Sequence, residues 1–194
     1  MSSADVTAAK TSLRRELLAR RGRHTDADRA QIAATLADVF AAEFEPRIRG
    51  GVGSVAPLHV VALYLSFATE PGTGPLIQWL ADQRVRALVP TLLPDADLGW
   101  MDLPHGAPLG LDAITDAEVI LVPALAVDLH GHRLGRGGGS YDRALTRVRP
   151  GQTVLAVVHD HEVLDAVPFE PHDRVVDGAL TPSGVRYFGT AADG

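Results

Sequence analysis

The sequence lacks cysteine altogether, so it has no disulfide framework, thiolate metal site or cysteine nucleophile. It also lacks long apolar runs: the longest, 60–65 and 119–127, are far shorter than the ~20 residues that span a bilayer. Segment 1–10 has no apolar run behind its charges and does not resemble a secretory signal. These absences predict a soluble, cytoplasmic protein that does not enter a membrane.

Lysine is almost missing as well, since Lys10 is the only one and arginine supplies the rest of the positive charge. The formal net charge is −6 at pH 7, whereas nucleic-acid-binding proteins usually carry a basic surface. We therefore expect no nucleic-acid partner. Lys10 is chemically unusual, because no other side chain of the sequence supplies a compact ammonium group.

Length and hydrophobic content indicate a single folded domain. The chain has 194 residues, within the usual size of one domain, and 46% of them are hydrophobic, enough to form a core. No internal repeat or long linker divides it. We expect one domain over 1–194, frayed at 1–9 and 189–194, and a monomer.

Short apolar segments alternate with segments of helical pattern along most of the chain. Strands are expected at 60–66, 87–92, 119–123, 154–159 and 175–181, and helices at 10–21, from Thr25 onward, at 75–83 and at 141–148. Segment 94–116, rich in Pro, Gly and Asp, is expected to form a small hairpin or loop. Continuously apolar strands between helices indicate parallel pairing. The pattern predicts a three-layer α/β sandwich with a mostly parallel sheet.

Segment 133–142, RLGRGGGSYD, is the most informative part of the sequence. Consecutive glycines let backbone N–H groups approach a ligand closely, and the start of the next helix adds further N–H groups. Arg133 and Arg136 can contact phosphate oxygens in a bidentate manner. The segment therefore indicates a phosphate-binding loop, although a flexible surface loop with solvated arginines has the same composition.

Two familiar phosphate-binding motifs do not match this segment. A P-loop requires a lysine after its last glycine, and no lysine lies nearby. A dinucleotide-binding fingerprint begins at Gly135 but meets Ser140 at its third glycine position, and it starts far beyond the preceding strand. Asp160 after the next strand imitates the acid of that fingerprint, yet we do not expect a nicotinamide-dependent enzyme.

Several motifs in order resemble the 5-formyltetrahydrofolate cyclo-ligase family. The stretch 122–145, VPALAVDLHGHRLGRGGGSYDRAL, is similar to the family's signature, and 10–14, KTSLR, to its amino-terminal element. Segment 65–70, LSFATE, resembles its folate-contacting segment, and the pairs His172-Asp173 and Val176-Asp177 its carboxyl-terminal element. The likeness spans residues 10–181. It departs from the family at Ser140, where a tyrosine is common, and in 101–111.

The resemblance implies an ATP- and Mg²⁺-dependent ligase that converts 5-formyltetrahydrofolate to 5,10-methenyltetrahydrofolate with release of ADP and phosphate. It also implies a fold shared with CoA-transferase-like and ribose-5-phosphate-isomerase-like proteins. The implied catalytic residues are Arg136, Tyr141 and Lys10, the substrate contacts Leu65 and Glu70, and the metal ligands Asp142 and Asp177. The implied ATP-binding residues are Lys10, Thr11, Ser12, Leu13, Arg14, Arg133, Leu134, Gly135, Arg136, Gly137, Gly138, Gly139, Ser140 and Tyr141.

Taken singly, these residues also have ordinary structural explanations. Asp142 and Asp177 suit a helix start and a turn, while Lys10 and Arg14 suit the solvated face of a helix. Glu70 suits a loop cap, Tyr141 suits packing on the sheet, and loop histidines such as His130 and His159 are more often solvated than metal-bound.

Two other functions remain open from the residues alone. A sugar-phosphate isomerase on a similar scaffold would use the glycine loop without ATP or Mg²⁺. A non-catalytic binder would retain folate or nucleotide without turnover. The joint presence of charged residues in every motif favours the ligase over the binder.

Overall fold

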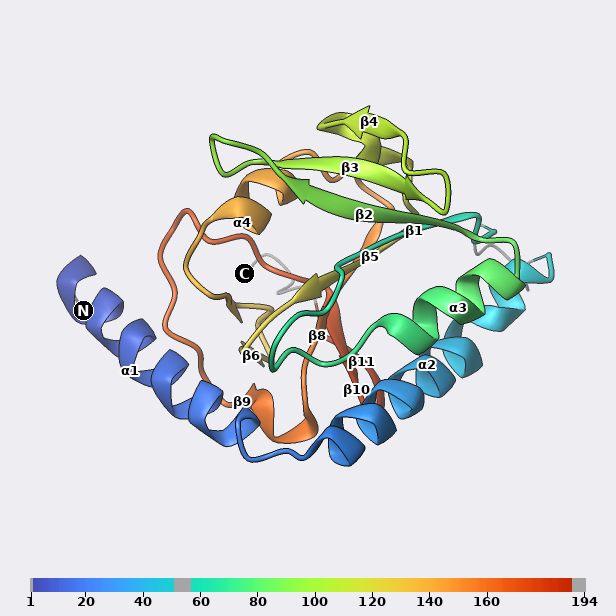
Figure 1. Ribbon diagram of the computed structural model, residues 1–194. Helices are drawn as coiled ribbons and strands as arrows, with labels where there is room; N and C mark the ends of the chain where they lie inside the picture. The colour runs from blue at the N-terminus through green and yellow to red at the C-terminus, as the bar shows by residue number, and fades with distance from the viewer. Residues whose placement is uncertain (1, 51–56, 190–194) are drawn as a thin grey trace.

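The computed structural model describes residues 2–50 and 57–189. An eight-stranded sheet has the order β11-β10-β8-β5-β1-β2-β3-β4, and its central strands β10, β8, β5, β1 and β2 are parallel (Figure 1). Its strands are β1 (Val60–Leu63), β2 (Arg86–Leu92), β3 (Leu98–Leu103), β4 (Pro108–Gly110), β5 (Val119–Pro123), β8 (Thr153–Val157), β10 (Gly178–Thr181) and β11 (Gly184–Tyr187). The prediction of an α/β fold with a mostly parallel sheet is confirmed.

The sheet is buried on both faces because successive strand residues alternate between two apolar clusters. Val61 and Leu63 face α2 (Asp26–Ile48) and α3 (Gly74–Asp82), whose buried side chains include Phe40. Val60 and Ala62 face the other side, where α4 (Ser140–Leu145) and a 3-10 turn, η1 (Asp112–Asp116), cover the sheet. Helices on both faces make the three layers.

The amino-terminal helix α1 (Ser3–Arg21) lies apart from α2 and α3, at the lower left of Figure 1. It begins well before residue 10, because the Ser2 side chain accepts a hydrogen bond from the Asp5 N–H and the Asp5 carboxylate bonds back to Ser2. Residues 3–9 are therefore helical, and the expectation of fraying at 1–9 is wrong for them. At the other end, residue 189 carries no regular structure, and 190–194 lie outside the described residues.

The second helix begins where its sequence signal places it. Thr25 and Asp28 form a reciprocal capping box ahead of Asp26–Ile48. The helices expected at 75–83 and 141–148 are found as α3 and the shorter α4, which ends at Leu145.

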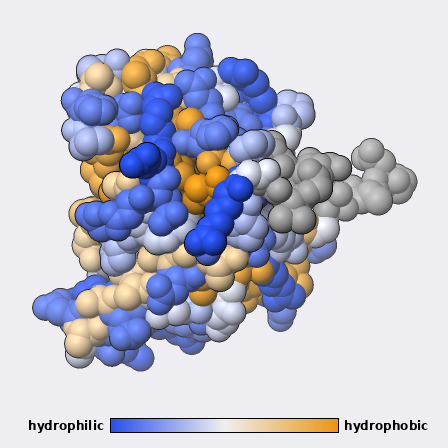
Figure 2. Space-filling model, turned by 90° about the vertical axis from the view of Figure 1, so that its right-hand side faces the viewer, coloured by the Kyte–Doolittle hydropathy of each residue, from blue (hydrophilic) through white to orange (hydrophobic). Residues whose placement is uncertain are grey.

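In Figure 2, which views the molecule from the right-hand side of Figure 1, hydrophilic residues surround small apolar areas, in keeping with helices that bury one side only. None of the described helices combines the length and apolarity needed to cross a membrane.

Segment 94–116 extends the sheet rather than leaving it. Its first strand, β3, pairs antiparallel with β2 from Ala87↔Leu103 to Leu92↔Leu98, and β4 pairs antiparallel with β3. Three expected strands are shorter than predicted, since β1 ends at Leu63, β8 ends at Val157 and β10 begins at Gly178. A separate three-stranded sheet was not predicted: β7 (Arg133–Leu134), β6 (Ala126–Asp128) and β9 (Val163–Leu164).

Asp128 and Gly131 fold the turn between β6 and β7 that precedes the glycine loop. The buried Asp128 carboxylate accepts hydrogen bonds from the N–H groups of His130 and His132 and from that of Val167. These bonds lower the pKa of Asp128 although burial alone would raise it. Gly131 has φ +83° and its carbonyl accepts from the Val176 N–H at 2.9 Å.

We predict that Gly131→Ala destabilises the protein more than Gly151→Ala. A Cβ at Gly131 would lie 2.3 Å from the Val176 carbonyl oxygen, whereas Gly151, with φ +92°, has nothing within 4 Å. The left-handed backbone costs either alanine about 1–2 kcal/mol, and the collision at Gly131 adds about 1–3 kcal/mol. Denaturant unfolding of both variants measures the difference. Equal losses would show that segment 175–176 moves aside without cost.

Candidate active site

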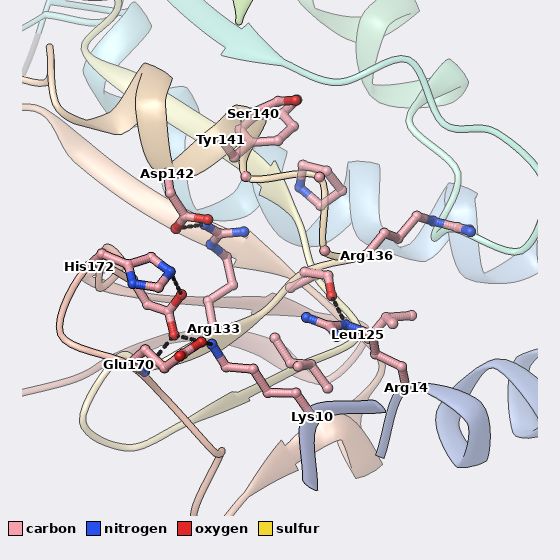
Figure 3. A pocket seen from close by; sticks show the side chains of 18 of the residues that line it. Lys10, Arg14, Leu125, Arg133, Arg136, Ser140, Tyr141, Asp142, Glu170 and His172 are labelled. Carbon is pink, nitrogen blue, oxygen red and sulfur yellow. Dashed lines mark hydrogen bonds and ion pairs between the residues drawn. The ribbon is translucent and has the colours of Figure 1, made fainter. Parts of the chain in front are cut away.

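The polar face of α1 forms one wall of a pocket. Lys10 and Arg14 are four residues apart, so both side chains project from the same face (Figure 3). The Lys10 Nζ lies 2.6 Å from Asp173 Oδ2 and 3.0 Å from Glu170 Oε2. Burial disfavours the charged ammonium, but the two carboxylates outweigh it and raise the pKa of Lys10. Lys10 is therefore a buried, fully protonated cation at neutral pH.

The glycine loop forms the opposite wall. Arg14 Nε donates to the Gly135 carbonyl at 2.9 Å, which ties the loop to α1. Gly139 is the N-cap of α4 in the left-handed conformation, φ 69°, so the chain turns there directly into the helix that carries Asp142. The buried guanidinium of Arg133 reaches Asp142 Oδ1 at 2.7 Å. The glycine backbone and the arginine side chains of the loop thus line the same space.

Segment 66–72, after β1, closes the side of the pocket at the glycine loop. The Glu70 carboxylate accepts from Arg136 Nε at 3.1 Å and from the Phe67 N–H at 3.1 Å. The Arg136 guanidinium carbon lies 4.9 Å from the centre of the exposed Phe67 ring. Two motifs distant in sequence, LSFATE and the glycine loop, therefore meet.

These elements enclose a pocket of about 450 Å³ at the carboxyl ends of the parallel strands, the usual ligand position in α/β sheets. The residues lining it are Thr7, Lys10, Arg14, Arg21, Glu70, Leu98, Pro123, Ala124, Leu125, Arg133, Leu134, Gly135, Arg136, Gly137, Gly138, Gly139, Ser140, Tyr141, Asp142, Glu170, His172 and Asp173. Most residues implied by the family resemblance are among them.

Four of the implied ligand-binding residues do not line the pocket. Thr11 and Ser12 are exposed, and Leu13 packs against the apolar cluster around Leu17, because a helix turns neighbours of Lys10 to other sides. Leu65 is 51% exposed outside the pocket lining. Thr7 lines it instead, and its spacing of three residues from Lys10 is the signal that locates it.

The pairing of Asp142 with Asp177 is not found. Asp177 lies immediately before β10, where its carboxylate accepts the Val154 N–H at 2.7 Å, at the amino ends of β8 and β10. The pocket lies at the opposite ends of the parallel strands. Asp173, four residues earlier in the same family motif, lines the pocket together with Asp142, as do Glu70 and Glu170. The motif identified the segment, but the path of the chain decides which of its two aspartates reaches the pocket.

Tyr141 reaches the pocket from the start of α4. Burial raises its pKa well above the ordinary value of 10, and the nearby Glu70 carboxylate acts in the same direction. Its buried hydroxyl has no hydrogen-bond partner among the described residues. A neutral hydroxyl without a partner, beside a pocket, is suited to meet a polar group of a ligand.

The floor of the pocket contains a buried ion pair that the sequence did not reveal. Arg21, at the end of α1, donates from Nε and Nη2 to the two Glu162 oxygens, each at 2.7 Å. Their side chains are 1% and 0% exposed. Arg21 lies on the face of α1 that carries Lys10 and Arg14, seven residues beyond Arg14, and this spacing was a signal for it.

The histidines do not form a metal centre within residues 2–50 and 57–189, where no group of three or more acidic, histidine or cysteine residues could hold an ion. His159 is 6% exposed, and its ring packs edge-on against His24 at 4.8 Å between centroids. Burial lowers the pKa of His159 from 6.5 to about 4, despite the opposing effect of the Glu162 carboxylate.

We predict that His159 makes the protein acid-sensitive between pH 6.5 and pH 4. In this range the unfolded chain binds a proton at residue 159 and the folded protein does not. The free energy of unfolding therefore falls as pH drops, by at most about 3 kcal/mol. His159→Asn retains a capping side chain and removes this contribution. Denaturant unfolding at pH 7 and pH 4.5 compares the two proteins, and an identical pH dependence would contradict the prediction.

Comparisons with known proteins agree with this geometry. A family model, the 5-formyltetrahydrofolate cyclo-ligase family, matches residues 6–182. A 5-formyltetrahydrofolate cyclo-ligase of Mycolicibacterium smegmatis is 40% identical over 143 residues, 64% of this chain and 74% of that protein. One of Escherichia coli is 30% identical over 149 residues, 68% of this chain and 82% of that protein.

Two solved 5,10-methenyltetrahydrofolate synthetases share the fold. The Mycoplasma pneumoniae structure has a TM-score of 0.73 at 19% identity and covers 88% of this chain and 97% of its own. The Aquifex aeolicus structure has a TM-score of 0.72 at 23% identity, with 95% and 94% covered. Since the family match spans nearly the whole domain and includes every wall of the pocket, the chain belongs to the 5-formyltetrahydrofolate cyclo-ligase family.

Proposed function

We propose that this protein converts 5-formyltetrahydrofolate to 5,10-methenyltetrahydrofolate, using ATP and Mg²⁺ and releasing ADP and phosphate. The observation that carries the proposal is the junction of the glycine loop, the lysine of α1 and the Glu70 segment around one pocket. A phosphate-binding loop alone would suit many enzymes, but the Glu70 segment beside it supplies a second binding region. We further expect a cytoplasmic monomer that acts on small molecules.

The reaction needs a phosphoryl group to be held in line with the formyl oxygen. That oxygen attacks the γ-phosphorus and ADP leaves. The folate N10 then attacks the formyl carbon and loses its proton to solvent or to the departing phosphate, and the C–O bond breaks to release phosphate. Transfer of this kind depends chiefly on positioning and charge stabilisation. The residues proposed for it are Lys10, Arg14, Arg133 and the amides of 135–141, which together surround the place of the phosphates.

Lys10 and Arg136 are the proposed catalytic cations. Lys10 is already held by Glu170 and Asp173, so its ammonium is oriented before a ligand arrives. Arg136, held by Glu70, sits where the glycine loop meets the proposed folate segment and would neutralise the phosphoryl group during transfer. Tyr141, with its unpartnered hydroxyl, would position the formyl group.

The carboxylates of Asp142 and Asp173 fit a Mg²⁺ ion bound together with the nucleotide. Mg²⁺ usually takes one or two protein carboxylates and completes its coordination with waters and phosphate oxygens. Both carboxylates line the pocket, where Asp173 is paired with Lys10 and Asp142 with Arg133. A bound phosphate could attract these cations and leave the carboxylates free to bind Mg²⁺. The ion would neutralise charge on the transferring phosphates. Glu70, which lines the pocket, and Leu65, which is half exposed outside the lining, would contact the folate.

The proposed reaction can be followed by the absorbance of the methenyl product. Purified protein is mixed with 5-formyltetrahydrofolate, ATP and Mg²⁺, and each component is omitted in turn. Product only in the complete mixture supports the proposal. Folate binding without product would favour a non-catalytic binder. Phosphate-ester binding without any response to folate or ATP would favour the sugar-phosphate isomerase.

We predict that Asp142→Asn and Asp173→Asn raise the Mg²⁺ concentration needed for half-maximal turnover by about tenfold or more, because each removes one charged oxygen ligand. The substitutions hardly change side-chain volume, so both variants should fold. Asp177→Asn is the matched control, since Asp177 belongs to the same segment but does not line the pocket. A Mg²⁺ response altered in Asp177→Asn but not in Asp173→Asn would reverse this assignment.

A further inference from the structure

Helix α1 is connected to three separate parts of the pocket through side chains of one face. Lys10 binds the carboxylates of segment 170–173, and Arg14 binds the Gly135 carbonyl of the glycine loop. Arg21 binds the Ala124 carbonyl, in the turn between β5 and β6, at 2.6 Å from Nη2. The apolar contacts of the helix are few: Leu17 lies in a small cluster with Leu125 and Leu134, and Val6 is buried outside that cluster. The polar contacts therefore contribute much of what holds α1 in place.

Arg21 is the deepest of the three attachments. Its guanidinium makes two parallel bonds to Glu162, while the Lys10 and Arg14 contacts are only part-buried. A bidentate pair of this kind fixes the plane of the guanidinium. Glu162 is itself held in place, because its Oε2 accepts the His159 N–H at 2.8 Å. Glu162, which is itself held in place, thus sets the direction of the hydrogen bond from Arg21 to the Ala124 carbonyl.

The residue that follows Ala124 is bonded to β7, the strand that leads into the glycine loop. This residue, Leu125, donates its N–H to the Leu134 carbonyl at 2.7 Å. Leu134 stands between Arg133, which holds Asp142, and Gly135, which holds Arg14. A shift of the 124–125 turn would consequently move the glycine loop that lines the pocket.

The hydrogen bonding of Arg21 is not arranged for maximal stability. Its Nη1 is buried without a hydrogen-bond partner in the described part of the chain, which is energetically unfavourable. Buried ion pairs are also often no more stabilising than apolar residues of similar volume. Beyond stability, the pair fixes the orientation of the Arg21 guanidinium. It does so where α1, η2 (Asp160–Glu162) and the β5–β6 turn meet.

We propose that Arg21, oriented by Glu162, is a positioning residue for the phosphate-binding half of the pocket. Acting through Ala124 and through α1, it aligns the glycine loop with Lys10 and Arg14. The inference rests on the proposed function for its expected effect on ATP. Its effect on the loop is independent of any ligand.

The test uses the double variant Arg21→Met/Glu162→Gln. Methionine removes the bond to Ala124 without leaving a buried charge unpaired, and glutamine keeps an oxygen for the His159 N–H. We expect the dissociation constant for Mg²⁺-ATP, measured by calorimetry, to rise about tenfold or more, as small misplacements of binding groups commonly cause. The dissociation constant for 5-formyltetrahydrofolate should change less than about threefold, because Glu70 is also held within its own segment by the Phe67 N–H and meets the glycine loop through the flexible Arg136 side chain.

The control is Leu36→Ala, in the α2 layer on the other side of the sheet, which leaves a cavity in the core and destabilises the protein without touching the pocket. Both dissociation constants should stay at their wild-type values in this variant. A folded double variant that binds Mg²⁺-ATP like the wild type would overturn the inference and leave Arg21 a purely structural residue.

Hydrogen exchange separates this inference from the proposed function. In the double variant, the amides of 124–125 and 134–139 should exchange faster than in the wild type, while those of β1 and β5 should not. This holds whether or not the protein binds ATP. A wild type without turnover or ATP binding would refute the proposed function alone, and unchanged exchange at 134–139 would refute the positioning role.

Discussion

The pocket depends on one requirement: positive side chains of α1 must find acceptors in segments that are distant in sequence. Lys10, Arg14 and Arg21 reach respectively a carboxylate pair, a loop carbonyl, and a buried carboxylate with a second carbonyl. Desolvating an arginine or lysine is costly unless its hydrogen bonds are replaced. The acceptors therefore hold α1 across the pocket, and α1 in turn holds the walls at defined positions.

This arrangement also sets the electrostatics that a ligand meets. Three of the pocket cations are paired with carboxylates that also line the pocket: Lys10 with Asp173, Arg133 with Asp142, and Arg136 with Glu70. An entering phosphate would find cations already oriented rather than free in solvent, which reduces the reorganisation that binding requires. The carboxylates released from these pairs would then be available to a divalent cation. The same pairs thus account for both proposed ligands.

The sheet explains why distant motifs come together. Parallel strands place their carboxyl ends on one edge, so the segments that follow β1 and β5 end at the same place. Asp177 illustrates the converse, because a residue that precedes a strand lies at the opposite edge. Asp173 is only four residues earlier, yet it reaches the pocket. Near a strand, a short separation in sequence decides which edge a side chain belongs to.

Local signals in the sequence were sufficient for the layers and for the glycine loop: the capping box at Thr25, the apolar run of β5, and the glycines before α4 each act over a few residues. The family resemblance supplied most of the other pocket residues. Neither determined the three-stranded sheet, the pairing of β3 with β2, the Arg21–Glu162 pair or the choice of Asp173 over Asp177. Those features join segments up to 141 residues apart, as Arg21 and Glu162 are. Such contacts depend on the path of the whole chain, because a side chain's partner is decided by where the backbone carries it and not by its neighbours in sequence.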